Sequence, residues 1–393
     1  MRTAIAATAL LLAPLAPLAP HAQAVAQGST SCRPTDATRR AQQRLQALAD
    51  SLVRDARDVP AVALTVFAPK LCLEWSGAAG VANRTTRAPM TPQHPVRIAS
   101  NTKTYTAAAI LRLMELGKLS LDDPVTKHLP ASSLAPLARD GYDLARITIR
   151  LLLQHRAGIY DYAMDSNFMA VVVGKPTHRW TRAEQVDSAT VWGAPYGPPG
   201  GAYHYTDTGY ILLGEIVERL TGLGLGEAFR SLLHYDALGL RSTWLETLEP
   251  RPAGALDLAH QYMDTLDTRG IDPSFDLYGG GGLAATTADM GRFTRALFVG
   301  GVFDKPATIT TMSTLPEGAA GPRAYALGVY RQELGGEVWW GHSGFWNTAS
   351  FYLPARGLTF AASISQQGKS SAMRALLAGA LAIVTDAERG TRE

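Results

Sequence analysis

The sequence is poor in cysteine and in net charge, and both shortages narrow the possible functions. Its 393 residues include only two cysteines, and 37 basic against 34 acidic residues leave a formal net charge of only +3. Two cysteines exclude a disulfide-rich scaffold and a cysteine-ligated metal cluster. Balanced charge gives no reason to expect nucleic acid or an anionic membrane as the main partner. With 46% hydrophobic residues, the composition is that of a globular chain with a large core.

Long hydrophobic runs are also missing, except near the N-terminus. Residues 1–24 contain one early basic residue, an apolar stretch and then Ala22-Gln23-Ala24, which fits the small-x-small pattern of signal-peptide cleavage. Prolines interrupt the apolar stretch, which is already short for a membrane span. We therefore expect residues 1–24 to be a cleaved signal peptide and the mature protein to be exported, periplasmic or secreted, without a stable membrane span.

The two cysteines, Cys32 and Cys72, both lie in the expected mature chain. In an oxidising compartment they could pair. Such a bond would close a loop of about 40 residues, worth on the order of 4 kcal/mol in the chain-entropy model. Two unpaired thiols are the alternative, and the sequence does not decide between them.

Histidine-rich motifs are absent as well. The nine histidines are scattered, and no pair has the H-x-x-x-H or H-E-x-x-H spacing of a zinc site, so no metal or other cofactor is expected. A nucleophile elbow at Ser343 fails, because Phe345 stands where G-x-S-x-G needs glycine and no histidine follows it. His155, in LLLQHRAG, is better explained as a structural histidine than as a ligand.

Apolar periodicity predicts strands at both ends of the chain and helices between them. Residues 36–57 repeat apolar side chains at helical spacing, and two β-rich runs follow, at 61–67 and 71–75. A sheet built from such distant segments argues against a parallel barrel. Further strands are expected at 325–330, 338–340, 349–353 and 358–364. A last helix is expected at 371–386.

These elements predict an α/β fold of the α+β type, in which an antiparallel sheet is flanked by helices and carries an inserted helical region. The sheet domain is expected to comprise residues 36–110 and 280–393. The inserted, mainly helical domain is expected to comprise residues 111–279. The sequence does not indicate an oligomeric state.

The strongest catalytic pattern is VRIASNTKTYTAAAI, around Ser100. Lys103 follows three positions later, so on a helix the two side chains share one face. The helix N-terminus contributes partial positive charge beside the hydroxyl, and this field together with desolvation favours a neutral lysine that takes the serine proton. S-x-x-K is common by chance, so a simple N-cap role for Ser100 is the alternative.

The second pattern is GGAYHYTDTGYILLGEIVERLTG. In it, Tyr205 precedes Asp207 on a turn that enters a helix expected to begin near Thr208. A phenol beside an ammonium could exist as phenolate and pass a proton to the leaving group. A partly buried structural tyrosine is the alternative, because the chain has 14 tyrosines.

The third pattern is VWWGHSGFWNTASFYL, a strand that carries His342, Ser343 and Gly344. It offers a cationic or hydrogen-bonding edge, and Gly344 lets a substrate backbone approach closely. Backbone N–H groups here and at Ser100 could form an oxyanion hole.

In this order, the three patterns resemble the S-x-x-K, Y-x-N and K/H-T-G motifs of class C β-lactamases, D-alanyl-D-alanine carboxypeptidases and related esterases, the serine β-lactamase-like or penicillin-binding family. The resemblance runs from about Arg39 to the C-terminus and includes LSLDDPVTKHLP, LLLQHRAGI, LGLRSTW and GGGGLAATTADMGRF. It implies a β-lactamase/transpeptidase-like fold and acyl transfer to water through a serine acyl-enzyme.

The resemblance also assigns roles. Ser100 would be the acylated nucleophile, with Lys103 and Tyr205 as its proton-transfer partners. His342 takes the place that lysine holds in many β-lactamases, and the backbone amides of Ser100 and Phe345 would hold the oxyanion. The residues expected to contact substrate are Asp207, His342, Ser343, Gly344 and Phe345.

Position 207 departs from the family pattern, which usually has asparagine there. An asparagine amide donates to a substrate carbonyl, whereas an ionised aspartate cannot. A carboxylate beside Lys103 also favours the charged ammonium and works against a neutral base. Either Asp207 accepts from a substrate amine, or Lys103 stays charged and Tyr205 is the base.

The sequence therefore predicts a serine hydrolase acting on D-amino-acid peptides, β-lactams or small esters, without choosing among them. A small-molecule or peptide substrate is the only expected partner. The alternative is a non-catalytic protein on the same scaffold that binds a cell-wall peptide or senses a β-lactam, since fold does not fix function.

Overall fold

Short runs of β-branched and aromatic residues form the main sheet of the computed structural model, which describes residues 32–319 and 321–390. The sheet has seven antiparallel strands in the order β2-β1-β12-β11-β10-β9-β8. Segments from both ends of the chain pair within it, with Val62 opposite Ile364. The expected antiparallel sheet of distant segments is thus confirmed. Its strands are β1 (Ala61–Ala68), β2 (Leu73–Gly80), β8 (Arg323–Tyr325), β9 (Tyr330–Leu334), β10 (Glu337–Gly344), β11 (Thr348–Leu353) and β12 (Leu358–Ile364).

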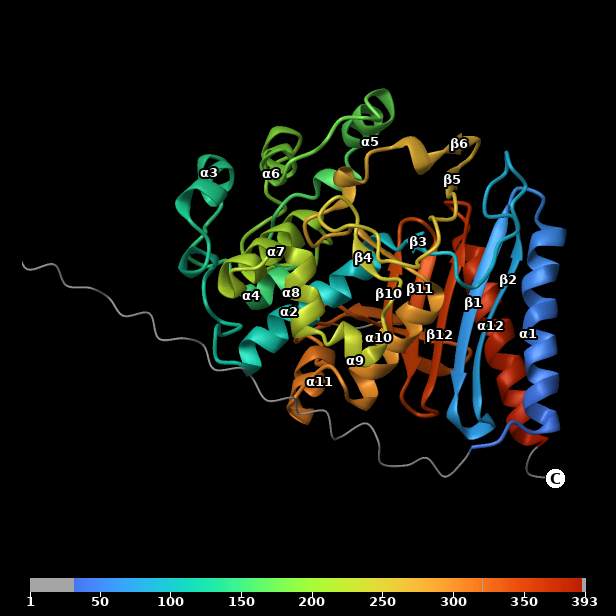
Figure 1. Ribbon diagram of the computed structural model, residues 1–393. Coiled ribbons are helices and arrows are strands. Elements are labelled where there is room, and N and C mark those ends of the chain that lie inside the picture. The colour runs from blue at the N-terminus through green and yellow to red at the C-terminus, as the bar shows by residue number, and fades with distance from the viewer. Residues whose placement is uncertain (1–31, 320, 391–393) are drawn as a thin grey trace, which may run out of the picture.

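Two terminal helices, α1 (Asp36–Asp55) and α12 (Ser370–Arg389), lie side by side and cover one face of this sheet (Figure 1). The stripe of α1 that faces inward is small and apolar, with Ala41, Leu45 and Ala49 buried. Within the described residues, α12 is also the one helix long and apolar enough to cross a membrane by length and composition. Its apolar side chains pack against the sheet in the structure, at the position of the last helix that the sequence predicts.

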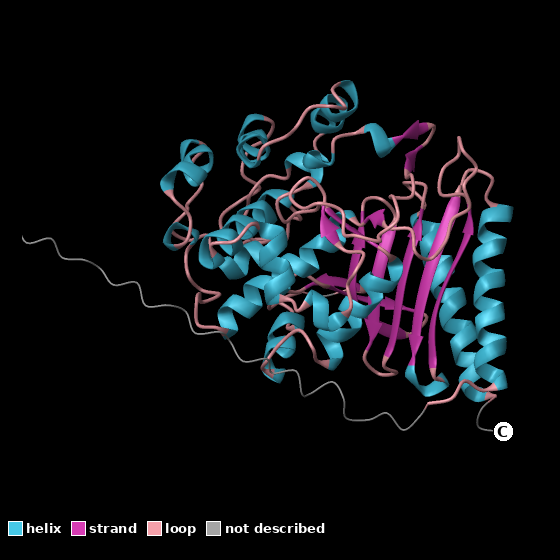
Figure 2. Cartoon of the chain, in the orientation of Figure 1, coloured by secondary structure: helices cyan, strands magenta, loops and turns pink. Residues whose placement is uncertain are grey.

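The opposite face of the sheet is covered by α10 (Thr287–Val299), beyond which most of the remaining helices gather (Figure 2). Among them α2 (Thr102–Glu115) runs through the middle and packs against α7 (Asp207–Thr221), and the side chains of α2 from Thr102 to Leu113 are all buried. The other helices are α3 (Ala131–Arg139), α4 (Ile149–Leu153), α5 (Ser166–Gly174), α6 (Arg182–Val191), α8 (Leu225–Leu232), α9 (Tyr235–Leu238) and α11 (Pro306–Ser313).

A small three-stranded sheet is built from segments that lie far apart in the sequence. Its order is β3-β7-β4, so that β3, which precedes Ser100, pairs with β7, which follows the glycine run 279–282. This pairing brings two segments far apart in sequence to the same side of α2. A separate two-stranded hairpin is formed by β5 and β6. The short strands are β3 (Val96–Arg97), β4 (Trp244–Leu245), β5 (Tyr262–Met263), β6 (Leu266–Asp267) and β7 (Leu283–Ala285).

Sheet and helices share one hydrophobic core, which includes Ala63 of β1, Ile110 of α2, Leu213 of α7 and Phe293 of α10. A second core lies between the sheet and the terminal helices. The division at residue 110 passes through α2, whose last residue is Glu115. The two-domain division stays a prediction, and the shared core binds both expected parts together.

Two local expectations differ from the structure. The apolar run 325–330 is not one strand, because β8 ends at Tyr325 and β9 begins at Tyr330. Gly328 lies in the turn between them with φ of +78°, and a Cβ there would lie 2.2 Å from the Cβ of Ala107. The helix expected to open at Ser100 begins at Thr102 instead, after a short 3₁₀ turn.

Cys32 and Cys72 form a disulfide with a Cα–Cα distance of 5.4 Å. The bond joins the segment before α1 to the turn between β1 and β2, so it fixes the start of α1 on the sheet edge. The pairing that the sequence left open is thus present. The predicted signal peptide, residues 1–24, lies outside the described residues.

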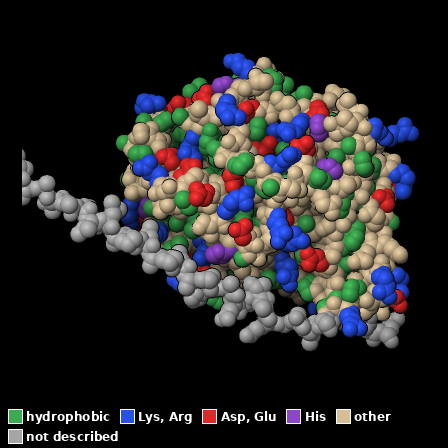
Figure 3. All heavy atoms as spheres, viewed as in Figure 1, with side chains coloured by type: hydrophobic (Ala, Val, Ile, Leu, Met, Phe, Trp, Pro, Cys, Tyr) green, Lys and Arg blue, Asp and Glu red, His purple; other side chains and the backbone are tan. Residues whose placement is uncertain are grey.

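Basic and acidic side chains both lie at the surface of the protein. On the face shown in Figure 3, basic and acidic side chains are interspersed, and neither sign gathers into a large patch. This distribution agrees with the small net charge of +3.

Candidate active site

Ser100 lies in a 3₁₀ turn, Ala99–Asn101, between strand β3 and helix α2. Ala99 is buried and has φ of +45°, a left-handed conformation that costs a non-glycine residue about 1–2 kcal/mol. The turn is held by Asn101, whose side-chain amide donates to the carbonyl of Ile98 (3.0 Å) and to the hydroxyl of Thr348 (2.9 Å). These bonds present the partly exposed Ser100 at the start of α2.

Gly344, at the end of β10, packs against this turn. A Cβ on Gly344 would lie 2.2 Å from the carbonyl oxygen of Ile98 and 2.6 Å from the hydroxyl of Thr348. We expected this glycine to admit a substrate backbone, but the backbone that approaches it is that of the protein itself. Gly344 therefore sets the distance between β10 and the turn that carries Ser100.

Lys103 is fully buried and has three acceptors for its ammonium group. Its Nζ donates to the Ser100 hydroxyl at 3.0 Å and to the carbonyl of Gly280 at 2.7 Å. The third partner is the carboxylate of Asp207, in an ion pair with Lys103. An ammonium has three N–H donors, so this arrangement satisfies all of them. The glycine run 279–282 supplies one of the three acceptors, the Gly280 carbonyl, a contribution that the sequence did not reveal.

Tyr205 reaches the same point from the segment that precedes α7. The Lys103 Nζ lies 4.9 Å from the centre of its ring. Burial, and then the negative charge of Asp207, raise the pKa of Tyr205 well above its usual value, while a hydrogen bond with Ser100 acts in the opposite direction. The resting side chain is therefore the neutral phenol. The phenolate that the sequence suggested is wrong for the resting state, because Asp207 and burial outweigh the ammonium.

His155 holds the Tyr205 segment in place. Its backbone has φ of +55°, its carbonyl accepts from the His204 N–H (2.8 Å), and its Nδ1 accepts from the Thr206 N–H (3.1 Å). The ring lies 4.2 Å from that of Tyr205. Burial, followed by Lys103, lowers the pKa of His155 well below its usual value, so the ring is neutral. The structural role expected for His155 is confirmed, and it acts next to the site.

Asp207 is the first residue of α7, and two more carboxylates lie near it. Asp161 is buried, and its Oδ1 accepts from the Asp207 N–H (3.1 Å) and from the Ala163 N–H (3.2 Å). Burial and then Asp207 raise the pKa of Asp161 to about 7. The same two causes, in the same order, raise the pKa of Asp276 to about 7.

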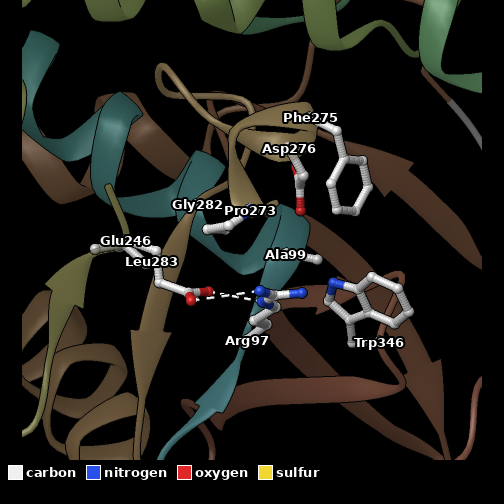
Figure 4. A pocket seen from close by; sticks show the side chains of 9 residues that line it. All are labelled: Arg97, Ala99, Glu246, Pro273, Phe275, Asp276, Gly282, Leu283 and Trp346. Carbon is white, nitrogen blue, oxygen red and sulfur yellow. Dashed lines mark hydrogen bonds and ion pairs between the residues drawn. The ribbon is translucent and has the colours of Figure 1, made fainter. Parts of the chain in front are cut away.

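Asp276 belongs to a small buried pocket beneath the Ser100 turn (Figure 4). Its carboxylate points toward Ala99, and a Cβ on Gly281 would lie only 1.7 Å from its Oδ1. At the base of the pocket Arg97 forms a buried ion pair with Glu246 at 2.7 Å. The space is large enough for about one water molecule, so it supports the Ser100 turn and does not hold a substrate.

His342 is buried on β10 and does not provide the cation that the sequence allowed. Its Nδ1 donates to the carbonyl of Ser343 (2.7 Å), and its Nε2 faces the hydroxyl of Tyr325 (3.1 Å). Burial, and then Lys103, lower the pKa of His342 to about 3. The cationic edge is therefore wrong, and the hydrogen-bonding edge is the one that the structure supports. Phe345, the first residue after β10, is 42% exposed.

The structure thus brings Ser100, Lys103, Tyr205, Asp207 and His342 to one place, as the order of motifs suggested. Sequence reasoning missed Asp161, Asp276 and the Gly280 carbonyl, which come from loops without a motif of their own. The segments LLLQHRAGI and GGGGLAATTADMGRF, noted for their resemblance, were the available signal. In the part of the chain that the structure describes, no group of three or more His, Cys, Asp or Glu side chains has the arrangement of a metal site.

Comparison with known proteins supports the same family. The sequence matches the beta-lactamase family over residues 46–383. It is 30% identical to penicillin-binding protein 4 of Amycolatopsis lactamdurans over 319 residues, 77% of this chain and 73% of that protein. It is 31% identical over 213 residues to esterase EstB of Burkholderia gladioli, 53% of this chain and 52% of the esterase.

Among solved structures, the D-amino acid amidase of Ochrobactrum anthropi SV3 complexed with L-phenylalanine superposes with a TM-score of 0.73 and 25% identity, covering 90% of this chain and 99% of the amidase. Such relatives are serine hydrolases with different substrates. The match covers most of the chain and agrees with the fold, the motif order and the geometry around Ser100. The chain belongs to the beta-lactamase family, among the serine hydrolases related to penicillin-binding proteins.

Proposed function

We propose that the protein hydrolyses an amide or ester through a covalent acyl-enzyme on Ser100. The observation that carries the proposal is the 3.0 Å hydrogen bond between the Lys103 Nζ and the Ser100 hydroxyl, in a site where Lys103 also pairs with Asp207. Nucleophile, base and a third group that orients the base recur in serine hydrolases of unrelated folds. The candidate substrates are D-amino-acid peptides, β-lactams and small esters.

Acylation requires that Ser100 lose its proton. Lys103 forms an ion pair with Asp207, so in this arrangement it accepts the serine proton while it passes one of its own to the Asp207 carboxylate. The Ser100 oxygen then bonds to the substrate carbonyl carbon. Tyr205, a phenol at rest, donates its proton to the leaving group and recovers one from Lys103, which takes back the proton held by Asp207. In net terms the serine proton ends on the leaving group, and the acyl group stays on Ser100.

Deacylation uses the same groups in reverse. A water molecule attacks the acyl carbon, gives up its proton through Tyr205 and Lys103, and the bond to the Ser100 oxygen breaks as that oxygen is reprotonated. During both steps negative charge develops on the carbonyl oxygen. The backbone N–H groups of Ser100 and Phe345 are the proposed donors to it, because the Gly344 contact fixes the Phe345 turn beside the Ser100 turn.

His342 and Ser343 are proposed to line the substrate channel along the edge of β10. Because His342 is neutral, its contribution is a hydrogen-bonding network through Tyr325 and not a charge. Export is proposed on the basis of residues 1–24, and the Cys32–Cys72 disulfide is what an oxidising compartment would permit.

Hydrolysis of p-nitrophenyl acetate, a small activated ester, tests the proposal. We expect the wild-type protein to release p-nitrophenol, Ser100→Ala to lose this activity, and Ser132→Ala, an exposed serine on α3, to retain it. Release that continues unchanged in Ser100→Ala would refute the assignment of the nucleophile. A protein that binds substrate analogues but turns over no ester would be the non-catalytic binding protein that the scaffold also allows.

A further inference from the structure

Carboxylates dominate the charge around Lys103. Asp207 forms an ion pair with it, and the charges of both Asp207 and Lys103 act on Asp161 and Asp276. The three aspartates come from three separate segments, at the start of α7, before the turn 162–164 and at the end of the turn 273–276. One ammonium thus faces three acidic side chains beside the proposed nucleophile.

The Asp207 carboxylate has one oxygen to spare. Its Oδ1 is buried against Lys103, yet the side chain as a whole is 15% exposed. The exposed part is therefore not the oxygen that holds Lys103. A carboxylate accepts about four hydrogen bonds, so Asp207 can receive another donor from the substrate side. Behind it, Asp161 is 1% exposed, its Oδ1 accepts from the Asp207 backbone, and its Oδ2 has no hydrogen-bond partner among the described residues.

No cation is left over for a substrate carboxylate next to Ser100, within residues 32–319 and 321–390. Lys103 has its three acceptors, and His342 is neutral. Arg97 is paired with Glu246 under the turn. Arg323, on the edge strand β8, is exposed; its guanidinium stacks 3.8 Å from the centre of the Tyr330 ring and its charge also acts on His342, so this cation lies on the β10 side of the site.

Resting on the proposed acyl-enzyme function, we propose that the site selects amides or esters that carry a protonated amine close to the scissile carbonyl, and that Asp207 binds this ammonium. Such substrates are derivatives of amino acids with a free amino group, or peptides cleaved next to their N-terminus. The ammonium donates to the free side of the Asp207 carboxylate while Oδ1 keeps Lys103. The charge of Asp207 repels an acyl donor with a carboxylate at this position, and Asp161 and Asp276 add negative potential behind it above about pH 7, where they lose their protons.

The expected selectivity follows from the nature of this hydrogen bond. A charge-assisted bond that is lost costs about ten- to a hundredfold in an equilibrium or rate constant. Acetylation of the substrate amine removes the positive charge and keeps the rest of the acyl donor. Replacement of Asp207 by asparagine removes the negative charge at nearly the same volume, and asparagine is the residue that the related motif usually has.

The test compares p-nitroanilides of D- and L-alanine, each with a free amine and with an N-acetyl group, on wild-type protein, Asp207→Asn and Asp143→Asn. Asp143 is an exposed aspartate between α3 and α4, so its variant changes the net charge equally away from the site. We expect wild type and Asp143→Asn to prefer the free amine at least about tenfold in kcat/KM. In Asp207→Asn this ratio should fall to about one, even though overall turnover falls as well, because Asp207 also takes part in the proposed proton transfer.

A second measurement on wild-type protein covers the case in which Asp207→Asn does not fold. D- and L-alaninamide should inhibit p-nitrophenyl acetate hydrolysis at lower concentrations than their N-acetyl forms do, and succinamic acid, which carries a carboxylate, should inhibit least. Equal or reversed preference in either assay, or a ratio unchanged by Asp207→Asn, would overturn the amine subsite while Ser100-dependent ester hydrolysis stands. Absence of that ester hydrolysis would overturn the proposed function and the subsite together.

Discussion

Replacing Asp161 by asparagine should make the stability of the protein less dependent on pH. Asp161 has its usual pKa near 3.8 in the unfolded chain and about 7 in the folded protein, because of burial and the charge of Asp207. Between these values the folded protein keeps a proton that the unfolded chain has lost. The carboxyl group therefore favours the folded state below about pH 4, and this contribution is lost as the pH rises through about 7.

Between about pH 5 and pH 7 this one group lowers the free energy of unfolding by about 2 kcal/mol. The Asp161→Asn variant removes the group that titrates, and its carbonyl oxygen can still accept from the backbone N–H groups of Asp207 and Ala163. Wild type should thus lose about 2 kcal/mol more than the variant over this range. Asp276, whose pKa is also raised to about 7, contributes to the pH dependence of the stability in both proteins, so its contribution cancels in the comparison.

Urea denaturation followed by tryptophan fluorescence at both pH values measures this difference, since the chain has seven tryptophans. Asp165→Asn is the matched control. Asp165 is partly exposed, and hydrogen bonds, first from the Asn167 backbone, lower its pKa, so its replacement should not reduce the loss between the two pH values. If wild type and Asp161→Asn lose the same stability, the buried carboxyl does not carry the proton that we assign to it.

Three other predictions concern the site and its supports. Tyr205→Phe should lower kcat/KM for an ester about a hundredfold or more, the usual scale for an acid–base group, and near-normal turnover would remove Tyr205 from the proton path. Replacing Cys32 and Cys72 together by serine should cost about 4 kcal/mol in urea denaturation, because the bond closes a loop with a sequence separation of 40; an unchanged midpoint would contradict this. Gly344→Ala places a Cβ 2.2 Å from a backbone carbonyl oxygen and should destabilise the protein by about 1–3 kcal/mol and lower turnover. Gly174→Ala, with open space at its Cβ, should do neither, and equal effects of the two alanines would refute the packing argument.

The parts of the site that the sequence predicted are those set by local spacing and by motif order. Ser100 and Lys103 are three residues apart and meet across the 3₁₀ turn that leads into α2, since residues three apart in helical backbone share one face. Tyr205 and His342 were located by their order after that pair. The antiparallel sheet followed from strand patterns at both ends of the chain.

The parts that the sequence did not predict depend on burial and on loops. Asp161 and Asp276 come from loops, and nothing in their neighbouring residues shows that they meet at Lys103. The charge of His342 was misjudged because burial and then Lys103 lower its pKa, and the residues next to it in the sequence show neither cause. The run 325–330 was predicted as one strand because its apolar residues are continuous, and the sequence does not show that Gly328 must turn there to clear Ala107.

The central claim is that Ser100 is the residue that becomes acylated. An alkyl fluorophosphonate, which reacts with activated serine hydroxyls, tests it most directly when the intact mass of the protein and the mass of the modified peptide are both measured. Wild-type protein should gain one phosphonyl group on Ser100, and Ser100→Ala should gain none. A label on another residue, or equal labelling of Ser100→Ala, would contradict the account.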